Sequence, residues 1–211
     1  MEILLFDEID STQNFLTKAI REGKIKKEIA ILANFQTNGV GSRGDKWISI
    51  KGNFFASIAI KEERLPKDLP LYSASIYFAF LIKEILKREN RDLRLKWPND
   101  LYIKDKKCGG VITSKIRDFF IIGVGVNFIA PNSAFGSLKW EDGSLNLLSE
   151  YIEAIKKSIS WKEIFSKYKL EFNSKDLAQS AAFRGTVPNK WDILQEDGSL
   201  QINGERIYSK R

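Results

Sequence analysis

The chain has 211 residues, of which 43% are hydrophobic and 29% charged, a composition typical of a folded globular protein and not of a disordered one. Its single cysteine excludes an internal disulfide and a cysteine-rich zinc site, and the lack of any histidine excludes Ser-His-Asp and Cys-His catalysis. The net charge of +7 comes from basic residues spread along the sequence, which favours a solvated surface over a nucleic-acid-binding tract.

The N-terminus carries acidic residues where a secretory signal would carry basic ones, and no apolar run reaches the roughly 18 residues of a membrane span. We therefore expect a cytoplasmic protein without membrane contact. Any catalysis must use lysine, arginine, carboxylates, polar groups and backbone amides, with a hard cation as the remaining option.

The sequence pattern mixes strand and helix signals without a regular alternation, which predicts an α+β fold and not a doubly wound sheet. The elements expected in the first half are a strand at 3–6, a helix from Ser11-Thr12 to Gly23, a strand at 29–35, a polar glycine-rich loop at 36–47, an alternating strand at 53–60 and an apolar helix at 71–87. Those expected in the second half are short strands at 93–97 and 101–103, a polar turn at 104–107, a strand at 119–128, an irregular segment at 129–147, helices at 148–158 and 161–172, and short strands from Arg184 separated by Asp197-Gly198 and Asn203-Gly204.

Residues 94–114 combine a Pro98-Asn99-Asp100 turn, several lysines and a Gly109-Gly110 pair. Strand ends, basic side chains and accessible amides together indicate a site for an anionic ligand. Lys96 within this segment fits either a phosphate contact or a strand-end lysine that extends to solvent.

The loop at 36–47 offers backbone amides at its glycines, with Arg43 and Lys46 as positive charges. Its glycine spacing is neither that of a Walker loop nor that of a dinucleotide-binding turn, so on its own it fits an exposed mobile loop equally well. Trp47 at its end predicts a core anchor or a ring that stacks on a ligand. Asn127 follows a strand whose glycines are explained by close strand packing, and it could equally face a ligand.

Five short motifs follow one another in an order that resembles the biotin protein ligase family, from about residue 5 to 128. They are Ser11-Thr12-Gln13, Gln36-Thr37-Asn38-Gly39 through Trp47, Lys96-Trp97-Pro98-Asn99-Asp100, Lys107-Cys108-Gly109-Gly110 and Gly123–Asn127. The resemblance implies a catalytic domain related to class II aminoacyl-tRNA synthetases, expected at 1–180, and a small β element of SH3 type at 181–211. It implies that biotin and ATP give biotinyl-5′-AMP and pyrophosphate, and that a carrier-protein lysine then takes the biotinyl group.

The resemblance also implies roles for individual residues. Catalysis would use Lys107, Arg43 and Asp100, with Asp100 as a possible ligand of Mg²⁺. Biotin would contact Ser11, Thr12, Gln13, Gln36, Gly39, Lys107 and Gly110. The nucleotide would contact Val40, Gly41, Ser42, Arg43, Trp47, Lys96, Asn99 and Asn127. The expected partner is the biotin carboxyl carrier protein of acetyl-CoA carboxylase or of another biotin-dependent carboxylase, with the ligase a monomer or homodimer.

The sequence departs from the family pattern in its glycine loop. Val40, Ser42 and Asp45 stand where the family has arginines, so that Arg43 or Lys46 must meet the phosphates, or nucleotide binding is weaker. The C-terminal element looks shortened, and the match begins too near Met1 for a DNA-binding domain, so no DNA partner is expected. Cys108 is expected to be a packing residue because no base is available to activate it.

Two alternatives stay open at this point. One is a lipoate ligase or octanoyl transferase of the same superfamily, which would lack the Lys-Trp-Pro-Asn-Asp turn. The other is a catalytically weak relative that binds biotin or nucleic acid, which the thinned arginine loop and the positive charge motivate.

Overall fold

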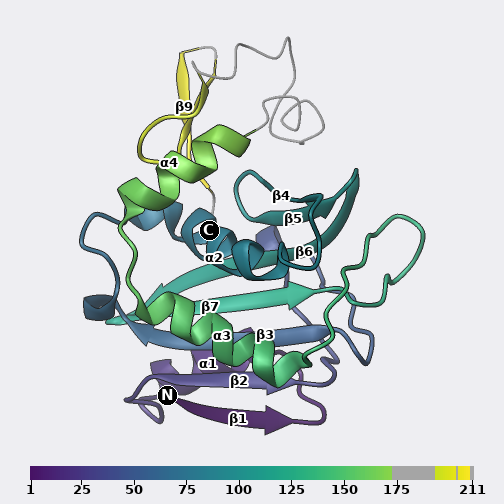
Figure 1. Cartoon of the computed structure of the whole chain (residues 1–211). Coiled ribbons are helices and arrows are strands. Elements are labelled where there is room, and N and C mark those ends of the chain that lie inside the picture. Colours follow the sequence, from purple (N-terminus) through teal and green to yellow (C-terminus); the bar gives the residue numbers. More distant parts are fainter. Residues whose placement is uncertain (173–192, 203, 210–211) are drawn as a thin grey trace.

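A computed structural model describes residues 1–172, 193–202 and 204–209, with the side chain of Arg43 left undescribed. The expected α+β fold is confirmed. Its centre is a seven-stranded sheet in which β1 and β2 are parallel and the other five neighbouring pairs are antiparallel (Figure 1). In spatial order the strands are β1 (Glu2–Phe6), β2 (Ile29–Ala33), β3 (Phe54–Lys61), β7 (Phe119–Val126), β6 (Lys106–Ile116), β5 (Asp100–Ile103) and β4 (Leu93–Lys96).

Helices cover both faces of this sheet. Helix α1 (Thr12–Arg21) lies on one face, while α2 (Ala74–Leu86) and α3 (Ser144–Lys156) lie on the other (Figure 1). Ser11 caps α1 as expected, because its hydroxyl accepts a hydrogen bond from the Asn14 amide. Three single 3₁₀ turns, η1 (Ser42–Gly44), η2 (Glu62–Arg64) and η3 (Leu71–Ser73), connect these elements.

The two helix layers create two separate cores. The larger joins the sheet to α2, α3 and α4 (Trp161–Glu171). The smaller lies beneath α1 and holds seven buried residues, Leu16, Ile20, Ile29, Ile31, Ala59, Phe119 and Ile121. No helix in the described ranges is long and apolar enough to cross a lipid bilayer.

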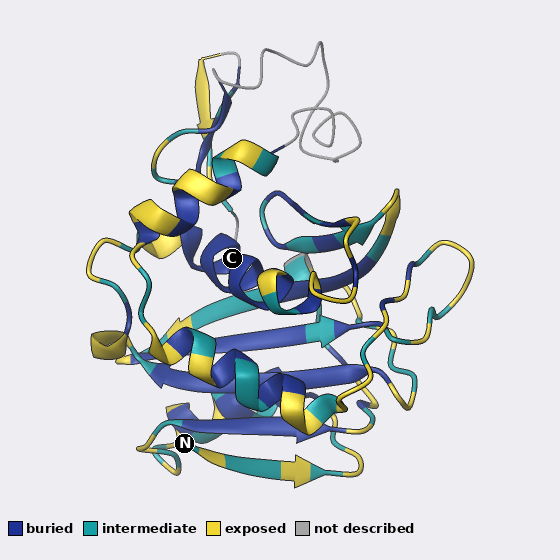
Figure 2. Ribbon diagram, viewed as in Figure 1, coloured by how far each residue is buried: buried dark blue, intermediate teal, exposed yellow. Residues whose placement is uncertain are grey.

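The segment at 53–60 is not the half-exposed, alternating strand that its sequence predicts. Seven of the eight residues of β3 are buried, and Figure 2 shows the strand dark blue along its length. The reason is its position, since β3 lies inside the sheet between β2 and β7 and is covered by helices on both faces.

Several boundaries also differ from the sequence prediction. Helix α3 begins at Ser144, inside the segment expected to be irregular, because Leu147 is already buried in the larger core. Asp100 belongs to β5 and Lys107 to β6, so that the polar turn between them is reduced to Lys104-Asp105. Strands β2 and β7 each stop two residues before the predicted ends at 35 and 128.

A small antiparallel pair, β8 (Leu200–Ile202) and β9 (Glu205–Ile207), follows a tight turn at Gln195–Ser199. The glycines of the two predicted hairpin dipeptides, Gly198 and Gly204, both have positive φ, as turns require, while Asn203 lies outside the described residues. The strand signal from Arg184 and the proposed boundary at 180/181 lie outside the described residues, so the division into two domains stays a prediction.

Candidate active site

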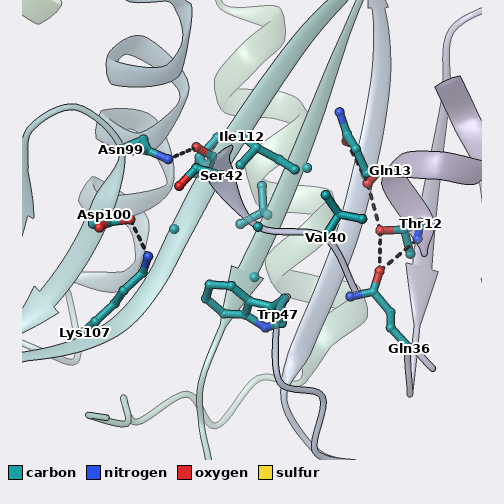
Figure 3. A pocket seen from close by; sticks show the side chains of 17 residues that line it. Thr12, Gln13, Gln36, Val40, Ser42, Trp47, Asn99, Asp100, Lys107 and Ile112 are labelled. Atoms are coloured by element: carbon teal, nitrogen blue, oxygen red, sulfur yellow. Dashed lines mark hydrogen bonds and ion pairs between the residues drawn. The ribbon is translucent and has the colours of Figure 1, made fainter. Parts of the chain in front are cut away.

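A cavity lies where the N-terminus of α1, the glycine loop and strands β3, β5, β6 and β7 meet (Figure 3). It is lined by Thr12, Gln13, Gln36, Val40, Gly41, Ser42, Trp47, Ser57, Asn99, Asp100, Lys107, Gly110, Val111, Ile112, Gly123, Val124 and Gly125. All five sequence motifs contribute lining residues, and the Gly123–Asn127 motif does so from β7.

One end of the cavity is neutral and hydrogen-bonded. The backbone amide and the hydroxyl of Thr12 both donate to Gln36 Oε1, at 2.8 and 3.1 Å, and the Ser57 hydroxyl donates to Thr12 Oγ1 at 2.8 Å (Figure 3). Because Gln36 Oε1 is already occupied by these donors, the Gln36 Nε2 donors remain for a ligand; they hydrogen-bond to no described residue. A neutral ligand group with an acceptor oxygen suits this end.

Gln13 is fixed beside this network. Its Nε2 donates to Ser114 Oγ at 3.1 Å, and its Oε1 lies 3.3 Å from the Ser57 hydroxyl. Gly123 on β7 leaves the space that Gln13 fills, since a Cβ there would lie 2.6 Å from Gln13 Oε1. The glycine in this strand therefore serves the close approach of a side chain.

The other end of the cavity is charged. Lys107 on β6 and Asp100 on β5 form an ion pair of 2.6 Å, with their side chains 27% and 25% exposed (Figure 3). Adjacent antiparallel strands place the two residues side by side, and Gly110 leaves Asp100 room, since a Cβ there would lie 3.3 Å from Asp100 Oδ1. This ammonium is the cation that an incoming carboxylate or phosphate at this end would meet.

Trp47 forms the wall between the two ends. Its ring packs flat against Gly125, where a Cβ would come within 2.7 Å of two ring carbons. The indole N–H is buried and finds no hydrogen-bond partner among the described residues, and Lys107 Nζ lies 5.8 Å from the ring centre. Trp47 is therefore packed against Gly125, and its indole N–H remains available to donate to a ligand.

The glycine loop closes on itself. The Gly41 amide donates to the Asp45 carbonyl at 2.7 Å, and Val40 and Lys46 form an isolated β-bridge. Val40 and Ser42 face the cavity where the family pattern has arginines, while Lys46 lines a neighbouring cavity together with Asn127. The backbone of Arg43 belongs to η1. Its side chain is not described, so its expected phosphate contact stays a prediction.

Asn99 and Lys96 border a second, larger cavity that shares Asp100 and Lys107 with the first. The Asn99 amide donates to the Val111 carbonyl at 2.7 Å, which fixes the turn before β5 onto β6. Lys96 is buried, with its ammonium 4.7 Å from the Tyr102 ring centre. It therefore does not extend freely into solvent, which was one of the two interpretations of this lysine.

The remaining predicted residues support the cavity without lining it, namely Ser11, Gly39, Lys96 and Asn127. Ser11 caps α1, and Gly39 accepts the Trp47 amide at 2.9 Å through its carbonyl. Asn127 is buried, and its Oδ1 accepts a hydrogen bond of 3.4 Å from the Asn53 side-chain amide. Its side chain thus attaches the residue after β7 to the segment before β3.

Sequence reasoning missed Ser57 and Ser114. Ser57 lies inside an apolar strand and is fully buried, so its hydroxyl requires a partner. Ser114 is only half-buried and follows Thr113 near the end of β6. Neither serine belongs to a motif, and only the place of Ser57 within an apolar run was a signal in the sequence.

Cys108 is fully buried, and its thiol lies 3.4 Å from the Leu101 carbonyl. Burial raises the pKa of this thiol to about 12, so it stays protonated and unreactive at neutral pH. The geometry agrees with the expected packing role.

Comparison with known proteins identifies the family. Residues 5–127 match the model of the biotin/lipoate A/B protein ligase family, which is more than half of the chain. The chain belongs to this family. The biotin acetyl coenzyme A carboxylase synthetase of Helicobacter pylori, solved with bound biotinylated ATP, is 34% identical and superposes with a TM-score of 0.86 over 98% of this chain and 99% of that one.

Two further relatives extend the comparison. The bifunctional ligase/repressor BirA of Escherichia coli is 36% identical in an alignment of 126 residues that covers 56% of this chain and 38% of that protein. The chain thus matches well under half the length of this curated relative. The biotin protein ligase of Leishmania major, solved with biotinyl-5-AMP, shares the fold at 19% identity, with a TM-score of 0.70 over 100% of this chain and 99% of that one.

Proposed function

We propose that this protein is an ATP-dependent biotin protein ligase. The observation that carries the proposal is one cavity with a neutral hydrogen-bonding end at Gln36 and a charged end at Lys107. Biotin has the matching polarity, with a neutral ureido ring at one end and a carboxylate at the other. The similarity to the Helicobacter pylori synthetase with its bound biotinylated ATP supports this choice of substrates.

In the first step a biotin carboxylate oxygen would attack the α-phosphorus of ATP. The new P–O bond forms as the bond to pyrophosphate breaks, giving biotinyl-5′-AMP. Both reactants are anions, so the protein must hold them together and offset their charge. Lys107 would do both, because it borders the first cavity as well as the second.

The triphosphate would lie along the second cavity, near Lys96, Asn99 and Ser42. Trp47 would separate this region from the biotin ring and could donate its unpaired indole N–H to the ligand. Because Val40, Ser42 and Asp45 carry no cation, the phosphate charge would be met by Lys107 together with Arg43 or Lys46.

Magnesium fits the site as a companion of the triphosphate. Among the described residues no three acidic, cysteine or histidine side chains form a preformed metal cluster, whereas Asp100 places one carboxylate at the charged end. One carboxylate plus substrate phosphates is an ordinary environment for Mg²⁺. Asp100 would hold the ion, which would offset phosphate charge when bound, and Lys107 would then be free to turn toward the biotin carboxylate.

In the second step the ε-amine of a carrier-protein lysine would attack the carbonyl carbon of biotinyl-5′-AMP. An amide bond forms, AMP leaves, and the amine loses a proton. The acceptor we propose is a biotin carboxyl carrier protein of acetyl-CoA carboxylase or a related carboxylase.

The decisive experiment combines the purified protein with biotin, ATP, Mg²⁺ and a carrier domain, and measures the carrier mass. Gain of one biotinyl group is expected, and its absence would refute the ligase proposal. Parallel reactions with lipoate and octanoate test the first alternative, which the hydrogen-bonded end at Gln36 disfavours because neither acid has a polar group to meet it. Salt-sensitive binding of generic DNA without carrier modification would support the second.

A further inference from the structure

The turn at Gln195–Ser199 is fastened to the rest of the protein by three consecutive backbone carbonyls. The Trp161 indole N–H donates to the Glu196 carbonyl at 2.8 Å, the Ser73 hydroxyl donates to the Asp197 carbonyl, and the Trp97 indole N–H donates to the Gly198 carbonyl at 2.9 Å. These donors come from α4, from η3 and from the segment between β4 and β5. Three elements that are distant in sequence thus donate hydrogen bonds to one short turn.

Trp97 differs from the other two donors in its neighbours. Like Trp161 it is buried in the larger core, but two residues later Asn99 is fixed to β6, where its side chain donates to the Val111 carbonyl and its carbonyl accepts the Val111 amide at 2.9 Å. Asp100 follows directly. The segment that carries Asn99 and Asp100 is therefore held on one side by β6 and on the other by the turn.

The turn tolerates little displacement. Gly198 is buried at φ +78°, and a Cβ there would lie 2.5 Å from Ser73 Oγ and 3.1 Å from the Trp161 ring. After β9, Ser209 lies 3.1 Å from Ser75 Oγ, and both serines line the second cavity with Trp97 and Asn99. The C-terminal element thus borders the region assigned to the triphosphate.

We propose that Trp97 is a positioning residue, through which the turn at 195–199 sets the placement of Asn99 and Asp100 at the nucleotide end of the site. The expected effect on ATP binding rests on the proposed function, whereas the expected effect on the placement of Asn99 and Asp100 does not. Trp97 borders the second cavity, but its indole N–H is occupied by the Gly198 carbonyl and would act on nucleotide binding through the backbone of Pro98 and Asn99.

The first test compares Trp97→Phe with Trp161→Phe, since each removes one indole N–H from a carbonyl of the same turn. Biotin-dependent ATP–pyrophosphate exchange is expected to show a KM for ATP raised about fivefold or more in W97F, with the KM for biotin within about twofold of wild type. W161F should leave both constants within about twofold. Equal effects of the two variants on the KM for ATP, or no effect of W97F, would overturn the proposal.

The second test leaves both tryptophans in place. Gly198→Ala should displace the turn, whereas Gly204→Ala changes another positive-φ glycine of the same element that has nothing within 4 Å of the added Cβ. G198A should reproduce the ATP effect of W97F and G204A should not. This pair decides the question if W97F does not fold, and identical kinetics of G198A and G204A would contradict the proposal.

Hydrogen exchange of the Val111 amide supplies a readout independent of turnover, because this amide donates to the Asn99 carbonyl. Exchange should be faster in W97F and G198A than in W161F and G204A. An inactive wild-type protein would refute the proposed function and leave this comparison intact. Unchanged Val111 exchange in both W97F and G198A would refute the positioning role whatever the activity.

Discussion

At the neutral end of the cavity, Thr12, Gln36 and Ser57 hydrogen-bond to one another and are buried, whereas at the charged end Lys107 and Asp100 form an ion pair that is about a quarter exposed. The neutral end is organised before any ligand arrives, so binding there costs little reorganisation. At the charged end an anion must compete with Asp100 for Lys107. We therefore expect substitutions at the neutral end to change ligand binding and substitutions at the charged end to change the rate of the chemical step.

The largest effect is expected at the charged end. Lys107→Ala should lower kcat for pyrophosphate release by roughly 10²–10³-fold, because the group that offsets developing charge is lost. Biotin binding, measured by calorimetry, should weaken far less. Lys106→Ala, which removes a neighbouring exposed lysine, is the control and should retain activity. A K107A enzyme of normal kcat would overturn the catalytic assignment.

At the neutral end the expected effect is smaller and concerns binding. Gln36→Leu should raise the KM for biotin about 10- to 100-fold with kcat nearly unchanged, since about 1–3 kcal/mol follows from leaving buried partners unpaired. Gln36→Glu keeps the size but replaces the Nε2 donors with an acceptor, and should weaken biotin to a similar degree. If Q36E binds biotin normally, the ligand does not use the Nε2 donors.

A substitution in the glycine loop is expected to strengthen nucleotide binding at the charged end without affecting the neutral end. Ser42→Arg should lower the KM for ATP about threefold to tenfold, because a guanidinium at this cavity wall can pair with phosphate. Ser42→Gln offers similar reach without charge and should leave the KM for ATP unchanged. Equal values for the two variants would show that charge at this wall is not limiting.

The smallest effect is expected at Cys108, which lies beside Lys107 in the Lys107–Gly110 motif but is buried. The raised pKa of about 12 predicts no alkylation by iodoacetamide at pH 8 in the folded protein, with rapid labelling in denaturant. Because the folded pKa lies above the unfolded one, the thiol contributes stability that is present below about pH 8.5 and is lost as the pH rises toward 12. Cys108→Ala should keep activity; labelling of the native thiol would contradict its burial.

Local sequence patterns predicted most elements and the cavity residues that belong to motifs. Patterns failed where a neighbour distant in sequence decides the outcome. The burial of β3 on both faces depends on α1 and α3, and the role of Ser57 depends on Thr12, 45 residues away. The attachment of Trp97 to Gly198 spans 101 residues and has no local signature. Sequence reasoning therefore found the motif residues and missed the side chains that hold them.

Helix α1 carries Thr12 and Gln13 into the cavity, yet it packs on the small core of seven residues that the sheet separates from the larger one. A ligand that contacts Thr12 and Lys107 at once links a small cooperative unit to a large one. By mass action, such a ligand raises the free energy needed to open α1 more than that needed to open α2. Bound biotin would thus also stabilise α1, the helix that packs on the smaller core.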